Sequence, residues 1–480
     1  MASADVTASM PQLSPKDVSA AGPRSEDAGG GPAPASDVLK LDQDREREHF
    51  IPVTAYALID RLTAAHAWPP GVARAARRFF RYLDNWRRQQ YNAQLSELLQ
   101  TYEPFSPDSD LLVTRTFTPE ERRAMQKRVV ELVELILKQA NYKRIDPADM
   151  QMILTRESTY GLDLTVDFTA FDECLICYRG ATTRSEQRRS FKKFLRKEEF
   201  EVPIFQRLFL LFKLKPFETR VHEVMVQEKV SRREAERSVR RLRAPLPAAV
   251  KEDYIYLKLF KNIPRNDIEM IFPNTSVKFR PFDKLRLGLT ASGGLGVGAF
   301  GAAGKVALLA TNPIAAAGAV VGLGGIVFRQ AMNFMNQKQR YLIVMAQNLY
   351  FHAMADNRGV MIKLADRAAE EDVKEEMLLY SVLAKEKAKR ADLAAIDAAI
   401  EQYIAASFGV SVDFDLEDAL SRLLADGIVT EQADGTLIAL APDAAALHLD
   451  AKWDVFLDNL PDLIEPQGRE AEGNAAPDRT

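Results

Sequence analysis

The feature that most constrains this chain is a stretch of small and apolar residues at positions 287–328. Apart from Thr, Ser and Asn, the stretch contains a single charged residue, Lys305. A helix that crosses a bilayer needs about 20 predominantly apolar residues. Residues 287–310 meet this length, and residues 314–328 are fewer but end at Arg329, whose side chain is able to snorkel. The stretch therefore predicts two membrane crossings.

The two crossings are predicted to be joined by a turn at Thr311, Asn312 and Pro313, because Asn is a good N-cap and Pro fits the first helical position. The stretch holds eleven glycines, and each glycine costs roughly 1 kcal/mol in a water-exposed helix. In hydrocarbon, small residues at four-residue spacing allow helices to pack closely. The packing residues expected on this basis are Gly294, Gly298, Gly318 and Gly322. A buried soluble helical hairpin and a flexible loop remain alternatives.

Basic residues flank the stretch on both sides, whereas the turn carries no charge. Cytoplasmic flanks of membrane helices are enriched in Lys and Arg. We therefore expect an integral membrane protein with both termini in the cytoplasm, in the inner or plasma membrane if the source is bacterial.

The chain of 480 residues is long enough for two or three domains. The expected fold class is α+β and mostly helical. Its expected parts are disordered tails at 1–37 and 465–480, an α+β cytosolic region at 38–250, a small βαβ-like unit at 251–285, the transmembrane hairpin at 286–330, a cytosolic helical hairpin at 331–390, and an acidic winged-helix-like domain at 391–464. The first 36 residues lack the apolar core of a signal peptide.

Local patterns predict several elements within these parts. Apolar residues at helical spacing predict a helix over 72–99. Thr118, Pro119 and Glu121 have the pattern of an N-cap, a first-turn proline and a capping box, and predict a helix that runs to about residue 140. Cys174 and Cys177 lie within an apparent strand, where a spacing of three places them on opposite faces. We expect core cysteines rather than a redox or zinc pair, because no second ligand pair is present.

The segment 179–243 is strongly basic, with 19 Lys and Arg against 9 Asp and Glu. Anionic lipid and nucleic acid are both candidate partners for such a segment, and a solvated helical face is the alternative. The residues predicted to contact an anion or a lipid are Arg179, Lys192, Lys193 and Arg196.

The C-terminal residues 391–480 are acidic, with 4 basic and 19 acidic residues. A winged helix that reads DNA needs a basic second helix. Here that helix carries Asp415, Glu417 and Asp418 against Arg422 alone. DNA is therefore disfavoured, and we expect an unidentified protein partner at this domain.

A helix expected over 360–387 carries acidic residues that, with His352, raise the possibility of a metal site between paired helices. The acids concerned are Asp366, Glu370, Glu371 and Glu375. The Glu-x-x-His pairs of di-metal proteins are missing, so solvated charges are the favoured interpretation. We predict no metal, no cofactor and no catalytic residues.

Motifs spread over residues 70–460 suggest a family. They are Tyr102-Glu-Pro-Phe-Ser-Pro-Asp, Tyr178-Arg-Gly, Tyr256-Leu-Lys-Leu-Phe-Lys-Asn-Ile-Pro, Asp267-Ile-Glu-Met, Pro273, Asn348-Leu-Tyr-Phe, Asp356-Asn-Arg-Gly, Glu375-Glu-Met-Leu-Leu-Tyr and Val412-Asp-Phe-Asp. Together they resemble the transmembrane-protein-143-like family, a domain-of-unknown-function family. The resemblance implies a membrane protein, mitochondrial in animals, without an established activity. This chain departs from the family in its two cysteines before Tyr178 and in its glycine-rich first crossing.

The favoured function is a membrane-anchored binding or scaffold protein whose cytosolic domains are held at an anionic membrane surface. An oligomeric glycine-zipper pore and a membrane-bound enzyme of unidentified class are the alternatives. An enzyme is disfavoured because the sequence shows no Ser-His-Asp signature, no P-loop and no zinc ligand set.

Overall fold

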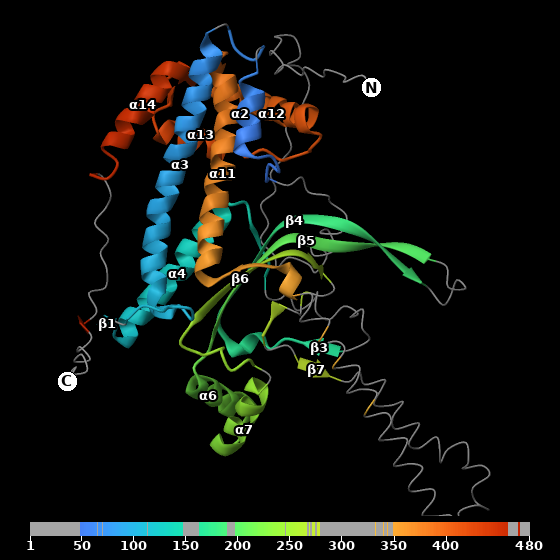
Figure 1. Cartoon of the computed structure of the whole chain (residues 1–480). Coiled ribbons are helices and arrows are strands. Elements are labelled where there is room, and N and C mark those ends of the chain that lie inside the picture. Colours follow the sequence, from blue (N-terminus) through green and yellow to red (C-terminus); the bar gives the residue numbers. More distant parts are fainter. Residues whose placement is uncertain are drawn as a thin grey trace, which may run out of the picture. The chain divides into compact units, whose positions relative to one another are not determined.

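The computed structural model describes residues 49–64, 66–69, 71–112, 114–146, 163–189, 197–244, 246–265, 276–278, 349–458 and 469–470, with the shorter pieces 268, 271–273, 332, 339 and 343. The chain divides into two compact units (Figure 1). The first unit combines residues 1–143 with residues 357–480, and the second comprises residues 144–356. The second unit is therefore inserted between two sequence segments of the first.

The predicted integral membrane fold is wrong. Within the described residues, no helix has both the length and the apolar composition that a bilayer crossing requires. The longest helices, α3 (Val72–Tyr102) and α11 (Asn357–Leu383), each carry several charged residues. The predicted location in a membrane, with both termini on its cytoplasmic side, is likewise not supported.

The residues assigned to the transmembrane hairpin lie outside the described residues. This applies to the packing glycines Gly294, Gly298, Gly318 and Gly322, and to the turn at Thr311, Asn312 and Pro313. The described part of the chain is a mixed α+β protein with one mostly helical unit and one unit built on an antiparallel sheet.

The first unit is organised around α3 and α11, which lie side by side (Figure 1). Helices α2 (Ala55–Leu62) and α4 (Pro119–Gln139) also pack against α11. The predicted start of α4 is confirmed: Thr118 is the N-cap, Pro119 occupies the first turn, and Glu121 completes the capping box. Aromatic rings join the two long helices, with the Phe79 and Tyr380 ring centroids 4.3 Å apart.

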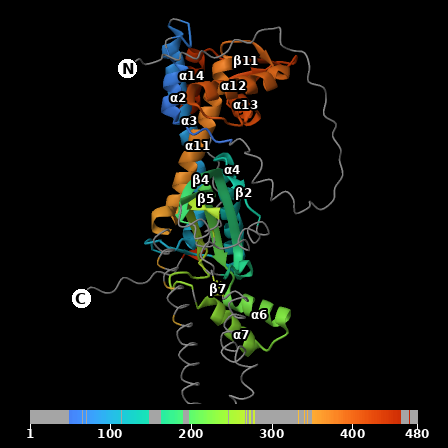
Figure 2. The same cartoon turned by 90° about the vertical axis from the view of Figure 1, so that its right-hand side faces the viewer.

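The C-terminal part of the first unit gathers at one end of these helices (Figure 2). Its elements are β9 (Ala388–Lys389), α12 (Leu393–Phe408), α13 (Leu416–Ala425), β10 (Val429–Glu431), β11 (Thr436–Ala439) and α14 (Pro442–Asp454). The strands form an antiparallel sheet in the order β10-β11-β9. Two helices followed by a hairpin whose second strand pairs with an earlier strand resemble a winged helix. We call this region the winged-helix-like part.

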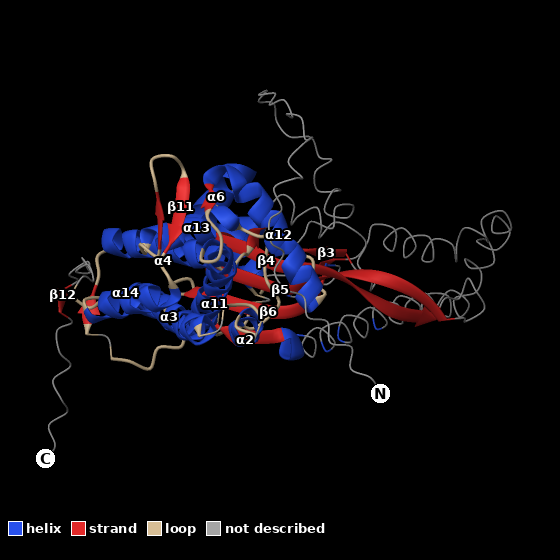
Figure 3. Cartoon of the chain, turned by 90° about the horizontal axis from the view of Figure 1, so that it is seen from above, coloured by secondary structure: helices blue, strands red, loops and turns tan. Residues whose placement is uncertain are grey.

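The second unit contains a five-stranded sheet in the order β2-β4-β5-β6-β8. Figure 3 shows its strands β4, β5 and β6 side by side. The strands are β2 (Lys143–Arg144), β4 (Phe171–Arg189), β5 (Lys197–Leu214), β6 (Ile255–Pro264) and β8 (Ala353–Asp356). The pairs β4–β5, β5–β6 and β6–β8 are antiparallel. Two helices, α6 (Phe217–Glu228) and α7 (Arg232–Arg243), connect β5 to β6 and pack on each other.

The short elements complete the fold. They are β1 (Arg115–Thr116) with β12 (Arg469–Glu470), β3 (Asp163–Thr165) with β7 (Ser276–Lys278), and the 3-10 turns Glu103–Phe105, Phe168–Ala170 and Arg390–Asp392. The pairing of β7 with β3 corrects the predicted βαβ-like unit. β6 and β7 belong to different sheets, so the segment between them does not connect two parallel neighbours.

Gly180 generates a first prediction about the second unit. It has φ +75° within β4, and an added Cβ would lie 2.5 Å from Oε1 of Gln206 on β5. We expect Gly180→Ala to destabilise this unit by on the order of 1–3 kcal/mol, because both the backbone conformation and the contact become unfavourable. Cys174 and Cys177, the only cysteines of the chain, lie on β4, so their labelling rate in denaturant measures the opening of this sheet.

Gln206→Ala provides the matched control, because it removes the opposing side chain and leaves Gly180 unchanged. The double variant is expected to lose less stability than the two single losses added together, since the closest contact, with Oε1 at 2.5 Å, is then removed and only the contact with the Cβ of residue 206 at 3.0 Å remains. Strictly additive losses would contradict the steric part of this argument.

Candidate functional site

Charged side chains in the middle of α11 are buried. They are Glu370, Glu371, Asp372, Lys374, Glu375 and Glu376. Helices α2, α3, α4 and α13 all pack against α11, so the helix has no solvent-facing side at this level. The predicted solvated acidic face is therefore wrong for Glu370, Glu371 and Glu375. These acids and their partners form the candidate site.

Arg422 of α13 is the cation with the most carboxylate contacts in this site. Its Nη2 lies 2.6 Å from Glu375 Oε2, and its Nε lies 2.8 Å from Glu376 Oε1. Its Nη1 lies 3.3 Å from Asp372 Oδ1 and 2.6 Å from Asp418 Oδ2. One guanidinium thus binds three buried carboxylates of α11 and the more exposed Asp418.

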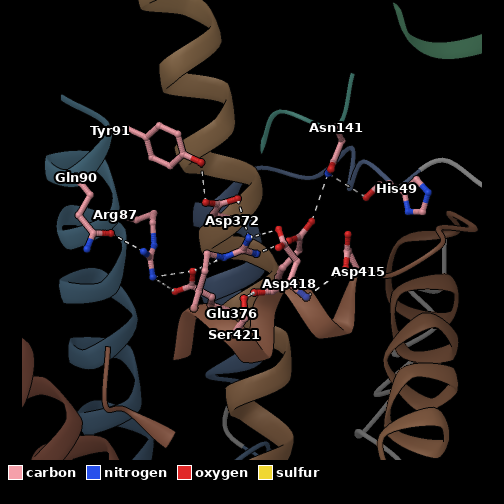
Figure 4. A network of polar contacts seen from close by, with 12 residues as sticks. His49, Arg87, Gln90, Tyr91, Asn141, Asp372, Glu376, Asp415, Asp418 and Ser421 are labelled. Atoms are coloured by element: carbon pink, nitrogen blue, oxygen red, sulfur yellow. Dashed lines mark hydrogen bonds and ion pairs between the residues drawn. The ribbon is translucent and has the colours of Figure 1, made fainter. Parts of the chain in front are cut away.

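Arg87 of α3 forms a second centre of the site (Figure 4). Its Nη2 lies 2.8 Å from Glu376 Oε1 and 2.7 Å from Asp426 Oδ2, and its Nη1 donates to Gln90. The other oxygen of Asp426 accepts from Lys452 Nζ of α14 at 3.1 Å. Helices α3, α11 and α14 and the residue after α13 are thereby joined through one set of ion pairs.

The segment before α2 completes the site through its backbone. Ile51 N–H donates to Glu371 Oε2 at 3.1 Å, and Lys374 Nζ donates to the Ile51 carbonyl at 2.5 Å and to Glu371 Oε1 at 2.9 Å. At the end of α4, Asn141 Nδ2 donates to Glu375 Oε1 at 3.3 Å and to the His49 carbonyl at 3.5 Å.

The environment of the site changes the proton affinities of its acids. Burial raises the pKa of Asp372 to about 7, although the charge of Arg422 acts in the opposite direction. Burial also raises the pKa of Glu375 well above its usual value, against the effect of Arg422. Tyr91 Oη donates to Asp372 Oδ2 at 2.7 Å. Burial and the nearby Asp372 raise the pKa of Tyr91, so this phenol stays protonated.

The metal site that the sequence left open is not formed. Within the described residues, no group of His, Cys, Asp and Glu side chains is arranged to hold a metal ion. Glu371 and Glu375 contact cations and amide donors instead, and Asp366 is an exposed partner of Arg88 at 2.5 Å. His352 lies in the second unit, where its Nδ1 is 2.7 Å from the Lys261 carbonyl oxygen.

A second candidate site is the outer side of α7 in the second unit. Arg233, Arg237 and Arg241 are exposed and succeed one another at four-residue spacing, so they project from one side of the helix. We call these three residues the arginine face. The buried residues of α7, Ala235 and Val239, belong to the opposite side. No ion pair within 4 Å joins the arginine face to a carboxylate among the described residues.

The other arginines of α7 have partners within the second unit. Arg232 binds Glu218 at 2.8 Å and Glu236 at 3.0 Å. Arg243 binds Glu252 at 2.8 Å and lies over the Phe217 ring. Arg232 and Arg243 thus stabilise the pair of helices α6 and α7, whereas the arginine face is available to a ligand.

The residues predicted for anion or lipid contact do not coincide with the arginine face. Arg179 lies on β4 and is only 6% exposed, and Lys192, Lys193 and Arg196 lie outside the described residues. The predicted basic segment was broad enough to include α7. The capping box formed by Ser231 and Glu234, followed by arginines at helical spacing, was the available signal for this helix.

The cysteines occupy the sheet core as predicted. Cys177 is buried, and burial raises the pKa of the Cys174 thiol to about 12. Neither cysteine forms a disulfide within the described residues. A thiol with a raised pKa is a poor nucleophile, which argues against a redox role.

Comparison with known proteins gives one family match. Residues 171–359 contain a DUF3754 domain, which is a domain of unknown function. The domain starts at the first residue of β4 and ends shortly after β8, so it includes the arginine face. The acidic stretch of α11 lies beyond it. The match does not confirm the transmembrane-protein-143-like family, and no solved structure matches the chain.

Arg422 generates the prediction for the buried site. Arg422→Met leaves Asp372, Glu375 and Glu376 without their shared cation, and removing one partner of a buried pair costs about 3–5 kcal/mol. All three tryptophans, Trp68, Trp86 and Trp453, belong to the first unit. Denaturation followed by tryptophan fluorescence is therefore expected to show this loss.

Arg390→Met is the matched control from the same winged-helix-like part. Arg390 also contacts two carboxylates, Glu431 at 2.8 Å and Glu417 at 3.3 Å, but its side chain is half-exposed. An exposed pair contributes about 1 kcal/mol or less. Equal losses in the two variants would show that burial does not set the importance of Arg422.

Proposed function

We propose that this chain is a binding protein whose DUF3754 domain attaches to anionic lipid headgroups through the arginine face of α7. The observation that supports the proposal is the exposure of Arg233, Arg237 and Arg241 on one side of a helix, with no ion pair within 4 Å to a carboxylate among the described residues. Eight residues of helix extend about 12 Å, which places three guanidiniums in a row suited to a flat surface. The attachment is peripheral and requires no segment that crosses the bilayer.

The position of Arg233 in the first turn of α7 supports the proposal that the arginine face binds a ligand. An arginine at this position does not stabilise the helix. Cations stabilise the last turn of a helix and are unfavourable in the first turn, because of the helix dipole. Arg240, Arg241 and Arg243 are in the last turn of α7. Arg233 is in the first turn, and it lacks the carboxylate contacts that compensate its neighbour Arg232.

Lipid headgroups suit this face better than single-stranded nucleic acid does. Proteins that bind single strands combine basic residues with aromatic side chains on which the bases stack. The sequence of α7 contains no aromatic residue. Nucleic acid is therefore the competing outcome of the test.

Neutralisation of the arginine face generates the prediction. Each basic residue near an anionic membrane surface contributes about 1 kcal/mol. The triple change Arg233→Gln, Arg237→Gln, Arg241→Gln in the full chain is thus expected to weaken binding to phosphatidylglycerol-containing vesicles by about 100-fold. Sedimentation with vesicles at low salt measures this, and binding of the unchanged protein is expected to weaken as salt rises.

The corresponding triple Arg→Lys variant is the matched control, because it keeps the three charges and is expected to bind nearly as well. Arg233→Gln alone is expected to weaken binding without lowering thermal stability. Undiminished binding of the triple Gln variant, equal binding to neutral vesicles, or displacement from vesicles by stoichiometric RNA would each contradict lipid attachment through this face.

A protein partner at the acidic winged-helix-like part is the second candidate function. Helix α14 has an exposed apolar residue, Leu447, between the exposed acids Asp443 and Asp450, and a basic amphipathic segment would complement this side. DNA is a poor candidate, because the cation of α13, Arg422, is directed toward the carboxylates of α11.

We also infer a relationship to the transmembrane-protein-143-like family. The inference is supported by sequence motifs alone, of which Tyr178-Arg-Gly and Tyr256-Leu-Lys-Leu-Phe lie within the DUF3754 domain. An experimental structure of a member of that family with a different strand order in its sheet would contradict the relationship.

A further inference from the structure

The buried ion pairs around α11 contain more acids than cations. The carboxylates are Glu371, Asp372, Glu375, Glu376, Asp426 and the half-exposed Asp418, and the cations are Arg87, Lys374, Arg422 and Lys452. We call these residues the α11 network. An excess of ionised carboxylates in a buried site is costly because burial removes their hydration. A bound proton on some of the acids relieves this cost.

Hydrogen-bond partners identify which acids are able to hold a proton. A protonated carboxyl must donate, so it needs a partner that is able to accept. The contacts of Glu376 and Asp426 described above are to arginine and lysine side chains, which only donate.

Asp372 and Glu375 differ from these two acids. Asp372 Oδ2 contacts the Tyr91 hydroxyl, which either donates or accepts. Glu375 Oε1 contacts the side-chain amide of Asn141, which presents an acceptor oxygen when it is rotated. In addition to Arg422, each of these two acids therefore has one partner that is able to accept a hydrogen bond instead of donating one.

We propose that Asp372 and Glu375 form a proton-dependent latch, which holds α13 against α11 near neutral pH and loosens as the pH rises. Arg422 of α13 contacts both acids, and its attraction to them increases when they ionise. Helix α13 also packs over α11 and keeps both acids buried, and the cost of burying the ionised acids exceeds this attraction, so ionisation disfavours the packing of α13. This inference concerns the first unit and does not depend on lipid binding by the second.

The latch is surrounded by titratable and charged groups from α3, α11, α13 and α14 and from the segment before α2. They are Arg87 and Tyr91 on α3, Arg422 and Asp418 on α13, Asp426 after α13, Lys452 and His448 on α14, His49 before α2, and Glu371, Lys374 and Glu376 on α11. The cations among them oppose protonation of the latch. Burial is the larger effect on both acids and determines the direction of the change.

The pH window follows from the shift at Asp372. An unfolded Asp has a pKa of about 3.9, and burial raises that of Asp372 to about 7 in the folded protein. The folded state therefore binds the proton more tightly. The stability that this acid contributes is complete below about pH 4 and is lost progressively as the pH rises through about 7. The unfolding equilibrium constant is expected to increase by up to tenfold per pH unit for one such proton.

Infrared spectroscopy of the full chain tests the latch directly. We expect a protonated-carboxyl band at pH 6 that fades by pH 8, and that is lost from the spectrum of the Asp372→Asn, Glu375→Gln double variant. The exposed acid Asp366 on the same helix provides the control variant, Asp366→Asn, which is expected to retain the band. Absence of a protonated carboxyl at pH 6 in the unchanged protein would overturn the proposal, whether or not the variants fold.

Hydrogen exchange, corrected for the intrinsic effect of pH, tests the consequence for α13. The unchanged protein is expected to lose protection in α13 between pH 6 and pH 8, whereas the double variant is expected to show a flatter response. The fluorescence-detected unfolding midpoint is expected to follow the same pattern. Equal pH dependence in the two proteins would show that these acids do not control the packing of α13.

Discussion

The first unit depends on the pairing between Arg422 and the carboxylates of α11. Charged groups lose hydration when they are buried, and they recover this loss only through partners with good geometry. An apolar helix in the position of α11 would tolerate several rotations about its axis. The charged helix is compatible with an orientation in which Glu376 meets Arg87 and Arg422, and in which Glu371 meets Lys374 and the backbone of Ile51. The acidic stretch thus restricts how α3, α11, α13 and the segment before α2, which are distant in sequence, assemble.

Local sequence signals were sufficient for much of the secondary structure. The helix expected over 72–99 is observed as Val72–Tyr102, and the capping box at Thr118 marks the true start of α4. Strand β5 was missed, because its continuous run of buried apolar residues, from Leu208 to Phe212, lacks the alternation that identifies a half-buried strand. In the sheet it lies between β4 and β6, and this central position is not encoded in local periodicity.

The buried site could not be predicted from local sequence patterns, for a similar reason. Seven successive residues of α11, from Glu370 to Glu376, are buried, whereas helical periodicity assigns charges to a solvent-facing side. The partners Arg87 and Arg422 are distant in sequence from α11 and from each other, so neither spacing nor composition connects them. Hydropathy also led to the wrong fold class, because the strongest apolar stretch was given more weight than the charged helices that form the described core.

Charged side chains are distributed differently in the two units, and the net charge of −3 of the whole chain does not indicate this difference. The first unit directs acids inward, where arginines and lysines compensate them. The DUF3754 domain exposes Arg233, Arg237 and Arg241 on the outer side of α7. A winged-helix-like order of elements would by itself suggest DNA as a ligand, but fold does not determine function. The helix that would read DNA uses its arginine to bind α11, and the arginines available to an external anion are found on a helix of the inserted domain.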